Sequence, residues 1–293
     1  MEYIARNLTH RENEFKRVLK NYDRKMKNIH DGYEKNIFVD DLTLIGLNTR
    51  GFMNIFCNAS IVSERNENIE IDLLQNIQRF AKSHFTMAYH PSENVTISFE
   101  EGKEIEVKAP GGLTLLMDCG SWMTYLSFFL VIRDQEGFDL MMKAQERDFR
   151  RSNLSLDKLD LAMINFYKHL NSPSEEVVIE TIKATEPFVG NYLDEQFAAD
   201  YVLNIYEPII GVYDALFRQN EQLFNEKLLK AIQLHKEYYN DQSEDTDHSP
   251  HASDGFISWF LLAPICLAYD RGMKIEVQSD YLPEWLIKRE FEL

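Results

Sequence analysis

The feature that most constrains the fold of this chain is the recurrence of apolar residues at helical spacing. Steps of four and three place one apolar stripe on a single helical face, formed by Phe15, Leu19, Tyr22, Met26 and Ile29. A second stripe of the same kind lies between Leu73 and Ala81. The segment from Leu113 to Arg133 is apolar nearly all round, which predicts an enclosed helix. Because each apolar face must pack on another element, these segments predict a core built from helices.

The second half of the chain continues the helical pattern with short interruptions. An apolar stripe runs from Leu159 to Leu170. The sequence Ser-Pro-Ser-Glu that follows predicts a new helix with Ser172 as its N-cap and Pro173 at its first position. Further helices are predicted over residues 193–218, 221–239 and 256–271. We therefore predict a mainly α fold of antiparallel helix pairs, in a bundle or an irregular helical array.

Strand signals are few. Apolar residues alternate from Val95 to Phe99 and from Ile105 to Val107, on either side of a Glu-Glu-Gly-Lys turn. This period of two around a turn predicts a small β-hairpin near residues 95–109. A second strand is predicted at Lys274–Val277, and it could pair with the hairpin into a small sheet.

Caps and breakers indicate where helices begin, bend and end. The segment Thr9–Glu12 has the spacing of a capping box. Pro208, with Gly211 nearby, and Pro264 should bend the helices that contain them, because proline cannot donate a backbone hydrogen bond. Gly272 follows a long apolar stretch and predicts a helix end in the left-handed conformation.

The charge of the chain restricts its partners. The formal net charge is −17, of which residues 1–150 carry −4 and residues 151–293 carry −13. We predict an N-terminal helical region over 1–150 and an acidic helical region over 151–293, joined in one continuous globular unit. A negative field repels nucleic acid and anionic lipid surfaces and favours a basic partner.

Cysteine usage and hydropathy indicate a cytoplasmic protein. Cys57, Cys119 and Cys266 are far apart and odd in number, which argues for a reducing compartment. The first residues are charged where a secretory segment would be apolar. The longest apolar run, Phe256 to Ala268, is shorter than the roughly 20 residues that cross a bilayer. We therefore expect no membrane span.

Residues of the types that catalyse reactions or bind metals occur, but not at the spacing that such sites need. His248 and His251 lie among aspartates in the polar segment 240–254, yet this spacing matches no rigid zinc-binding helix. Asp40 and Asp41 are adjacent, so their side chains diverge rather than face one substrate. We interpret Cys119 as a small buried residue rather than an activated thiolate. The sequence thus predicts no catalytic, cofactor or metal site, and a solvated acidic loop over 240–254.

The last eighty residues or so resemble the bacterial immunity protein 49 family, antidotes encoded beside polymorphic toxins. The resemblance lies in the helix from Phe224 to His235, the Ala-Tyr-Asp-Arg-Gly ending at Ala268–Gly272, the short strand at Lys274–Val277, and Tyr281–Pro283. These motifs cover about a quarter of the chain and identify a fold better than they identify a site.

The resemblance implies a non-catalytic antidote that binds and neutralises a cognate toxin domain in the bacterial cytoplasm. The acidic charge favours a basic toxin, because electrostatic steering speeds its capture. We predict that the toxin contacts Asp241, Glu244, Asp245 and Asp247. Two other classes stay open, namely a helical-repeat-like adaptor for a peptide or protein partner and a helical enzyme with an unrecognised site. A neighbouring toxin gene favours the antidote, a soluble partner peptide the adaptor, and turnover of a small substrate the enzyme.

Overall fold

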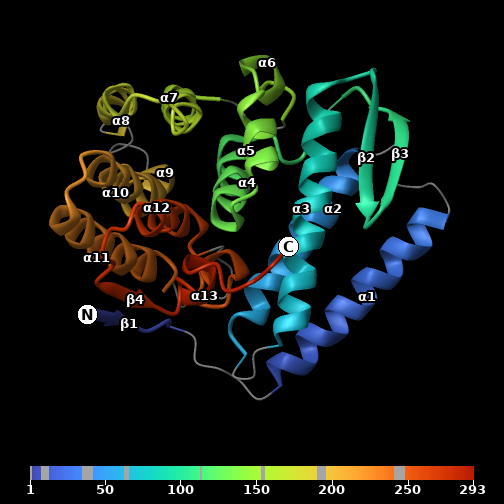
Figure 1. Ribbon diagram of the computed structural model, residues 1–293, viewed down its shortest axis with the longest axis horizontal. Helices are drawn as coiled ribbons and strands as arrows, with labels where there is room; N and C mark the ends of the chain where they lie inside the picture. Colours follow the sequence, from blue (N-terminus) through green and yellow to red (C-terminus); the bar gives the residue numbers. More distant parts are fainter. Residues whose placement is uncertain are drawn as a thin grey trace. The chain divides into compact units, whose positions relative to one another are not determined.

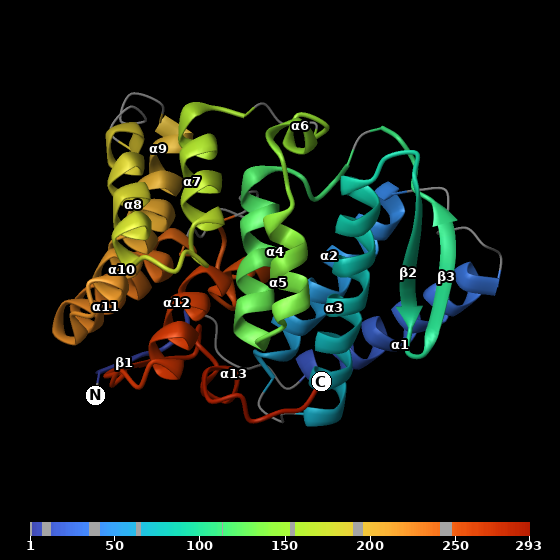
Figure 2. The same ribbon diagram turned by 45° about the horizontal axis from the view of Figure 1, so that its top comes forward.

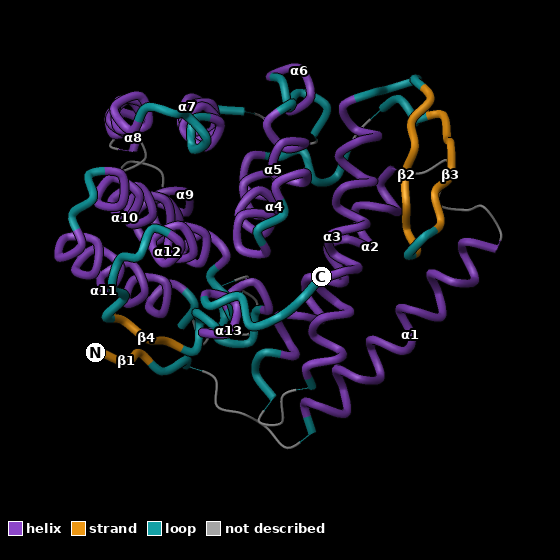
Figure 3. Tube along the Cα trace, viewed as in Figure 1, coloured by secondary structure: helices purple, strands orange, loops and turns teal. Residues whose placement is uncertain are grey.

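Helices make up most of the computed structural model, which confirms the predicted mainly α class (Figures 1 and 3). The structure describes residues 2–7, 13–34, 42–62, 66–112, 114–152, 156–189, 196–240 and 248–293. The predicted capping box at Thr9–Glu12 lies outside these ranges. Among the described helices, none combines the length and the apolar character needed to cross a bilayer.

Contacts within the chain define two compact units. The N-terminal unit comprises residues 10–129, 134–155 and 291–293. The C-terminal unit comprises residues 1–9, 130–133 and 156–290. The C-terminal unit carries 13 Lys+Arg and 25 Asp+Glu, a net −12, and the N-terminal unit carries 18 and 23, a net −5. The predicted regions 1–150 and 151–293, and their union in one globular unit, stay predictions.

The N-terminal unit is built on two long helices and a hairpin. Its elements are α1 (Glu14–Glu34), α2 (Leu42–Ala59), α3 (Glu67–Tyr89), β2 (Asn94–Glu100), β3 (Lys103–Lys108), α4 (Cys119–Ile132), α5 (Gln135–Met142) and α6 (Glu146–Phe149), with the last three residues of α4 assigned to the C-terminal unit. Helix α2 packs along α3, and the hairpin packs on α3 (Figure 1). The rings of Phe52, Phe80 and Phe99 join these three elements at centroid distances of 5.2 and 4.8 Å.

The hairpin confirms the strand prediction made from alternation. Strands β2 and β3 are antiparallel, and Val95 pairs with Val107 and Ile97 with Ile105. Gly102 adopts φ +70° in the turn, a conformation that favours glycine. All three cysteines lie in the described ranges, are buried and form no disulfide, as expected of small apolar residues.

The C-terminal unit consists mainly of helix pairs. Its elements are β1 (Glu2–Ile4), α7 (Lys158–Lys168), α8 (Glu175–Val189), α9 (Gln196–Tyr201), η2 (Val202–Tyr206), α10 (Glu207–Phe217), α11 (Glu221–Tyr238), η3 (Ser253–Gly255), α12 (Trp259–Asp270), β4 (Val277–Ser279) and α13 (Glu284–Ile287). Helix α7 pairs with α8 and α10 pairs with α11, as Figure 2 shows. The turn from α10 to α11 takes three residues, of which Gln219 has φ +54° and Asn220 caps α11.

The predicted strand at Lys274–Val277 is misplaced, and its predicted partner is wrong. The strand β4 begins at Val277 and pairs in parallel with β1, while the hairpin forms a separate sheet. The backbone N–H groups of Lys274 and Glu276 donate instead to Glu221 Oε2 (2.9 Å) and Asn225 Oδ1 (2.7 Å) on α11. Side chains of α11 therefore occupy the donors that a strand would use.

Three helices begin later than predicted. Helix α4 starts at Cys119 rather than Leu113, because the Asp118 carboxylate accepts from Ser121 N–H (2.8 Å) at the start of the helix. Helix α8 starts at Glu175, since the Ser172 hydroxyl accepts from Ser174 N–H (3.3 Å) in a turn before the helix. Helix α12 starts at Trp259, after the short η3 turn.

Gly272 ends α12 as the sequence predicts. It has φ +78°, its N–H donates to Tyr269 O (2.9 Å), and Met273 N–H donates to Ala268 O (3.0 Å). This pair of bonds is a Schellman motif, in which a left-handed residue satisfies the last carbonyls of a helix.

Replacing Gly272 by valine should lower the free energy of unfolding by about 1–2 kcal/mol, because a β-branched side chain is strained at positive φ. Urea denaturation would measure this loss. Gly272→Asn is the matched control, because asparagine tolerates the left-handed region and should lose less. Equal stability of the wild type and Gly272→Val would contradict the assignment of this helix end.

Candidate functional site

A π-helical segment, η2, lies between α9 and α10 in the C-terminal unit. The elements α9, η2 and α10 follow one another without a break, and the N–H of Glu207 donates to Val202 O, five residues back. Pro208 cannot donate a helical bond and crowds the preceding turn, which accounts for the wider turn just before it. Pro208 is predicted to bend this helix, and the structure shows a local widening directly before it.

A surface hollow of about 370 Å³ lies beside the π-helical segment. Its lining comes from α9, from η2, from the end of α11 and from two residues that follow α11, and consists of Asp200, Asn204, Glu237, Tyr238, Asn240 and His248. Helix α11 packs directly on η2, so residues almost forty positions apart in the sequence share one surface. We call these six residues, together with Tyr201, the tyrosine–carboxylate surface.

Aromatic rings form the centre of the tyrosine–carboxylate surface. The ring of Tyr201 lies 5.6 Å from that of Tyr238 and 4.9 Å from that of Tyr206, all in edge contacts. The ring of Tyr238 also lies 4.2 Å from that of His248, and Tyr238 Oη and His248 Nε2 share a hydrogen bond of 2.6 Å. Tyr201 and Tyr238 are each partly exposed. Rigid, partly exposed tyrosines of this kind are typical of the centre of a protein interface.

Two carboxylates border these rings without a cationic partner. Asp200 and Glu237 are exposed, and neither makes an ion pair in the part of the chain that the structure describes. Elsewhere in the C-terminal unit, by contrast, Asp214 pairs with Arg218 at 2.6 Å. Unpaired carboxylates beside aromatic rings can accept cationic side chains of a partner.

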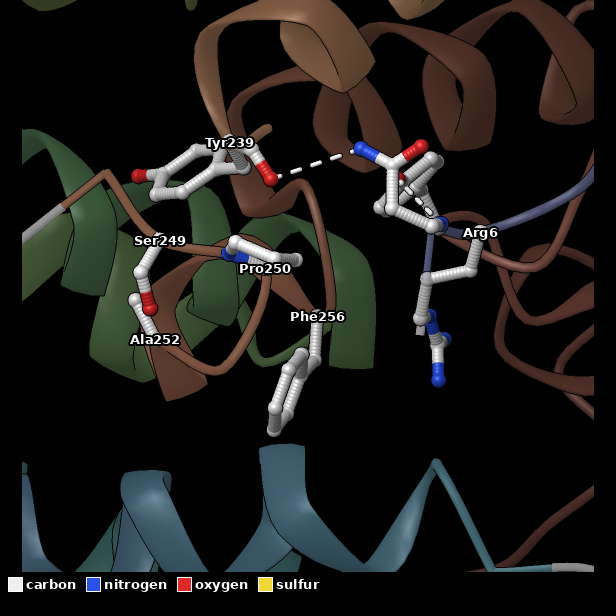
Figure 4. A pocket seen from close by; sticks show the side chains of 9 residues that line it. Arg6, Tyr239, Ser249, Pro250, Ala252 and Phe256 are labelled. Atoms are coloured by element: carbon white, nitrogen blue, oxygen red, sulfur yellow. Dashed lines mark hydrogen bonds between the residues drawn. The ribbon is translucent and has the colours of Figure 1, made fainter. Parts of the chain in front are cut away.

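A residue near the N-terminus forms hydrogen bonds with the end of α11. Asn7 Nδ2 donates to Lys236 O (2.8 Å) and to Tyr239 O (3.3 Å), and Figure 4 shows the second bond. The hollow drawn in Figure 4, lined by residues such as Arg6, Tyr239 and Phe256, has no room for a water molecule. It is therefore a packed junction rather than a ligand site.

His235 holds the segment 248–255, which begins with His248 of the tyrosine–carboxylate surface. It is buried, and its Nε2–H donates to Gly255 O at 3.1 Å. Burial lowers the pKa of His235 from 6.5 to about 4, so the ring is neutral at pH 7. A Cβ at Gly255 would lie 2.5 Å from the Tyr239 ring, so this position needs glycine for close packing.

The residues predicted from sequence to contact a partner, Asp241, Glu244, Asp245 and Asp247, lie outside the described residues. The residues on either side of that segment, Asn240 and His248, both line the hollow. Of the two histidines considered as metal ligands, His248 bonds Tyr238 Oη and His251 is exposed. Over the described ranges, no three His, Cys, Asp or Glu side chains come together to hold a metal ion.

Sequence reasoning missed the tyrosines and the flanking carboxylates. Tyr201 and Tyr206 are five residues apart, one π-helical turn, and Tyr238 precedes Tyr239 at the end of a strong helix pattern. Closely spaced tyrosines, one pair of them next to a polar loop, could have indicated a binding surface. That Tyr201 and Tyr238 contact each other depends on the tertiary packing of α11 on η2, which no local pattern shows.

Comparison with known proteins identifies the family. No curated protein and no solved structure matches the chain significantly. The family model of immunity protein 49 matches residues 55–286, most of the chain, and so extends far beyond the C-terminal motifs that suggested it. The chain therefore belongs to the immunity protein 49 family.

Proposed function

We propose that this chain is a bacterial immunity protein that binds one cognate toxin domain and blocks it without catalysis. Its membership in an immunity protein family carries the proposal. The cognate toxin belongs to a polymorphic toxin system, and the immunity protein acts in the cytoplasm of the cell that it protects. The acidic C-terminal unit supports a basic toxin domain as the partner, because opposite charge steers a fast encounter.

The tyrosine–carboxylate surface is the proposed centre of the interface. Its rings supply contact area at a small cost in side-chain entropy, and Tyr201 and Tyr238 already support each other in the free protein. Asp200 and Glu237 border the rings and are free to pair with lysine or arginine. This arrangement of an aromatic centre and a charged rim is characteristic of tight protein interfaces.

The acidic residues predicted from sequence extend the same proposal. Asp241, Glu244, Asp245 and Asp247 lie in the segment that connects Asn240 to His248, two residues of the surface. Neutralising the four acids should slow toxin association several-fold and flatten its salt dependence, because rim charges act mainly on the encounter rate. Unchanged association would remove this segment from the interface and leave the tyrosine–carboxylate surface to be tested separately.

Tyr238→Ala should weaken toxin binding by about tenfold to a hundredfold, mostly through faster dissociation. The side chain contacts Tyr201 and His248, so its removal both deletes contact area and loosens two neighbours. Surface plasmon resonance with the toxin domain would separate the two rates. Tyr269→Ala is the matched control, because Tyr269 is an exposed tyrosine of the same unit outside this surface.

The charges of the rim can be tested with a pair of double variants. Asp200→Asn with Glu237→Gln should slow association several-fold, whereas Glu104→Gln with Glu106→Gln on the hairpin removes the same net charge and should not. An equal effect of both pairs would show that only total charge matters and would contradict the proposed position of the interface.

The other two classes predict different results. An adaptor would bind a peptide derived from its partner as tightly as the folded domain, which the antidote should not do. An enzyme would inactivate the toxin at far less than one equivalent, whereas the antidote should need about one molecule for each toxin. Titration of toxin activity against immunity protein distinguishes these outcomes.

A further inference from the structure

Helix α1 is basic in a chain that is strongly acidic overall. Residues 16–27 carry six basic side chains and one acidic one. The basic side chains are Lys16, Arg17, Lys20, Arg24, Lys25 and Lys27. This local charge is opposite to that of the tyrosine–carboxylate surface and lies in the N-terminal unit. A partner that the acidic surface repels could therefore bind here.

A groove of about 370 Å³ lies between α1 and α2 within that unit. Helix α1 contributes Asn21, Arg24, Lys25 and Asn28 to its walls. Helix α2 contributes Gly51, Asn54 and Asn58. The lining is thus made of amides and cations, with the aliphatic side chains of Val18 and Ile55 buried beneath.

Lys25 is the cation held most firmly in this groove. Its Nζ donates to Asn48 Oδ1 at 2.8 Å and lies 5.2 Å from the centroid of the Phe52 ring. Neither Lys25 nor Arg24 makes an ion pair in the ranges that the structure describes, and Arg24 donates to the neutral amide of Asn21 at 3.2 Å. Burial disfavours the charged ammonium and lowers the pKa of Lys25 to about 8.

Gly51 makes the space that Lys25 occupies. A Cβ at this position would lie 2.3 Å from Lys25 Nζ. Glycine inside a helix is about 1 kcal/mol less favourable than alanine. Helix α2 therefore contains a helix-destabilising glycine at the point where the Lys25 ammonium packs against it. This is expected if ligand binding in the groove requires the ammonium at this position.

The asparagines of the groove suit the backbone of an extended peptide. A carboxamide has two N–H donors and a carbonyl acceptor, the same groups that a peptide backbone needs. Asn58 already accepts from Arg17 and donates to Asn54 O, so Asn21, Asn28 and Asn54 are the asparagines proposed to pair with the peptide. Asn21 and Asn28 are seven residues apart, a separation of about 10.5 Å along a helix. An extended peptide covers that distance in about three residues. The two amides are thus spaced for a short stretch of chain, with Arg24 and Lys25 between them.

We propose that the groove between α1 and α2 binds an extended acidic peptide segment, whose backbone pairs with the asparagines and whose carboxylate pairs with Lys25 and Arg24. This second binding site lies in the other unit from the tyrosine–carboxylate surface, and it accepts the opposite charge. It is independent of the proposed toxin interface and goes beyond it.

The probe for this site is an acetylated and amidated peptide, Glu-Ser-Glu-Ser-Glu-Ser, titrated into the full-length protein at pH 7 and followed by NMR and calorimetry. Alternation places its carboxylates on one face of an extended chain. The peptide should bind at least about tenfold more tightly than the same peptide with Gln in place of Glu. Its affinity should fall as the pH is raised above about 8, since Lys25 then loses its proton.

Two variants test the role of Lys25. Lys25→Met should weaken binding by at least about tenfold, and Gly51→Ala should do the same by displacing the ammonium while favouring the helix. Gly211→Ala is the matched control, because that helical glycine lies beside Lys227 with ordinary contact distances of 3.4 Å or more. Gly211→Ala should leave binding unchanged.

Three results would overturn the proposal. The first is absence of peptide binding to the wild type, and the second is equal binding by the wild type and by folded Gly51→Ala. The third is inorganic phosphate that displaces the peptide at equal concentration, which would make the groove a simple anion site. None of these results bears on the toxin interface, so the two proposals fail separately.

Discussion

Replacing Arg133 by alanine should lower the free energy of unfolding of the C-terminal unit by about 3 kcal/mol, the largest loss that we expect from one surface-reaching side chain. The guanidinium donates from Nη1 to Leu286 O (2.9 Å) and from Nη2 to Ile287 O (2.7 Å), two carbonyls of α13. It also bonds both carboxylate oxygens of Asp270, at 3.0 and 3.1 Å. Alanine would leave Ile287 O, the carbonyl of a buried residue, without its donor, and would leave Leu286 O with only the longer bonds from Arg289 N–H and Cys266 Sγ.

Arg218→Ala is the matched control for Arg133. Arg218 also bonds a carboxylate, that of Asp214, but it holds no carbonyl in the bonds described and is solvent-exposed. Its loss should change stability little. Urea denaturation followed by tryptophan fluorescence measures the difference, in a Trp122→Phe background that leaves Trp259 and Trp285 of the C-terminal unit as the only tryptophans. Equal losses for the two arginine variants would contradict the role of Arg133 in holding α13.

Acidification should destabilise both units through one buried histidine in each. Burial lowers the pKa of His84 in α3 to about 3 and that of His235 in α11 to about 4. An unfolded histidine has a pKa near 6.5, so on acidification the unfolded chain binds the proton first. The stabilisation is complete above pH 6.5 and is lost as the pH falls toward the folded pKa. At pH 4.5 each histidine should account for about 2–3 kcal/mol of lost stability.

His235→Gln isolates this effect from the protonation of carboxylates. Glutamine does not titrate and can still donate to Gly255 O. The loss in unfolding free energy between pH 7 and pH 4.5 should therefore be about 2–3 kcal/mol smaller than in the wild type. His90→Gln serves as control, because His90 is partly exposed. A wild-type and a His235→Gln protein with parallel pH dependence would contradict the buried, neutral state of His235.

Local patterns were sufficient to predict much of this fold. The stripes at helical spacing correspond to α1, α3 and α7, the alternation around Glu-Glu-Gly-Lys corresponds to β2 and β3, and Gly272 ends α12. In each of these cases the signal lies within one segment, so that periodicity or a single backbone conformation determines the structure.

Elements that depend on distant partners were not predictable in the same way. Strand β1 forms because residues 2–4 meet β4 at residues 277–279, and no local pattern of three residues shows this. Helix α2 is buried on several sides and contains Gly46 and Gly51, so it lacks a clear stripe. Gly46 lies close to Leu115, because a Cβ at this position would be only 3.1 Å from Leu115 Cβ.

The candidate site shows the same limit. Composition shows the acidic character of the second half, from which a positively charged partner is predicted. It could not show that Asp200, Tyr201, Glu237 and Tyr238 share one surface, because that depends on the packing of α11 on η2. Family membership adds what neither composition nor geometry supplies, namely the class of function.

The most direct test of the account is the interaction of the purified protein with the toxin domain that we propose is encoded beside its gene. We predict a complex of one to one stoichiometry with a dissociation constant of about nanomolar or tighter, loss of toxin activity at about one equivalent, and survival of cells that express both proteins. Absence of binding, or toxin activity that persists in the presence of excess protein, would contradict the assignment of this chain as the antidote.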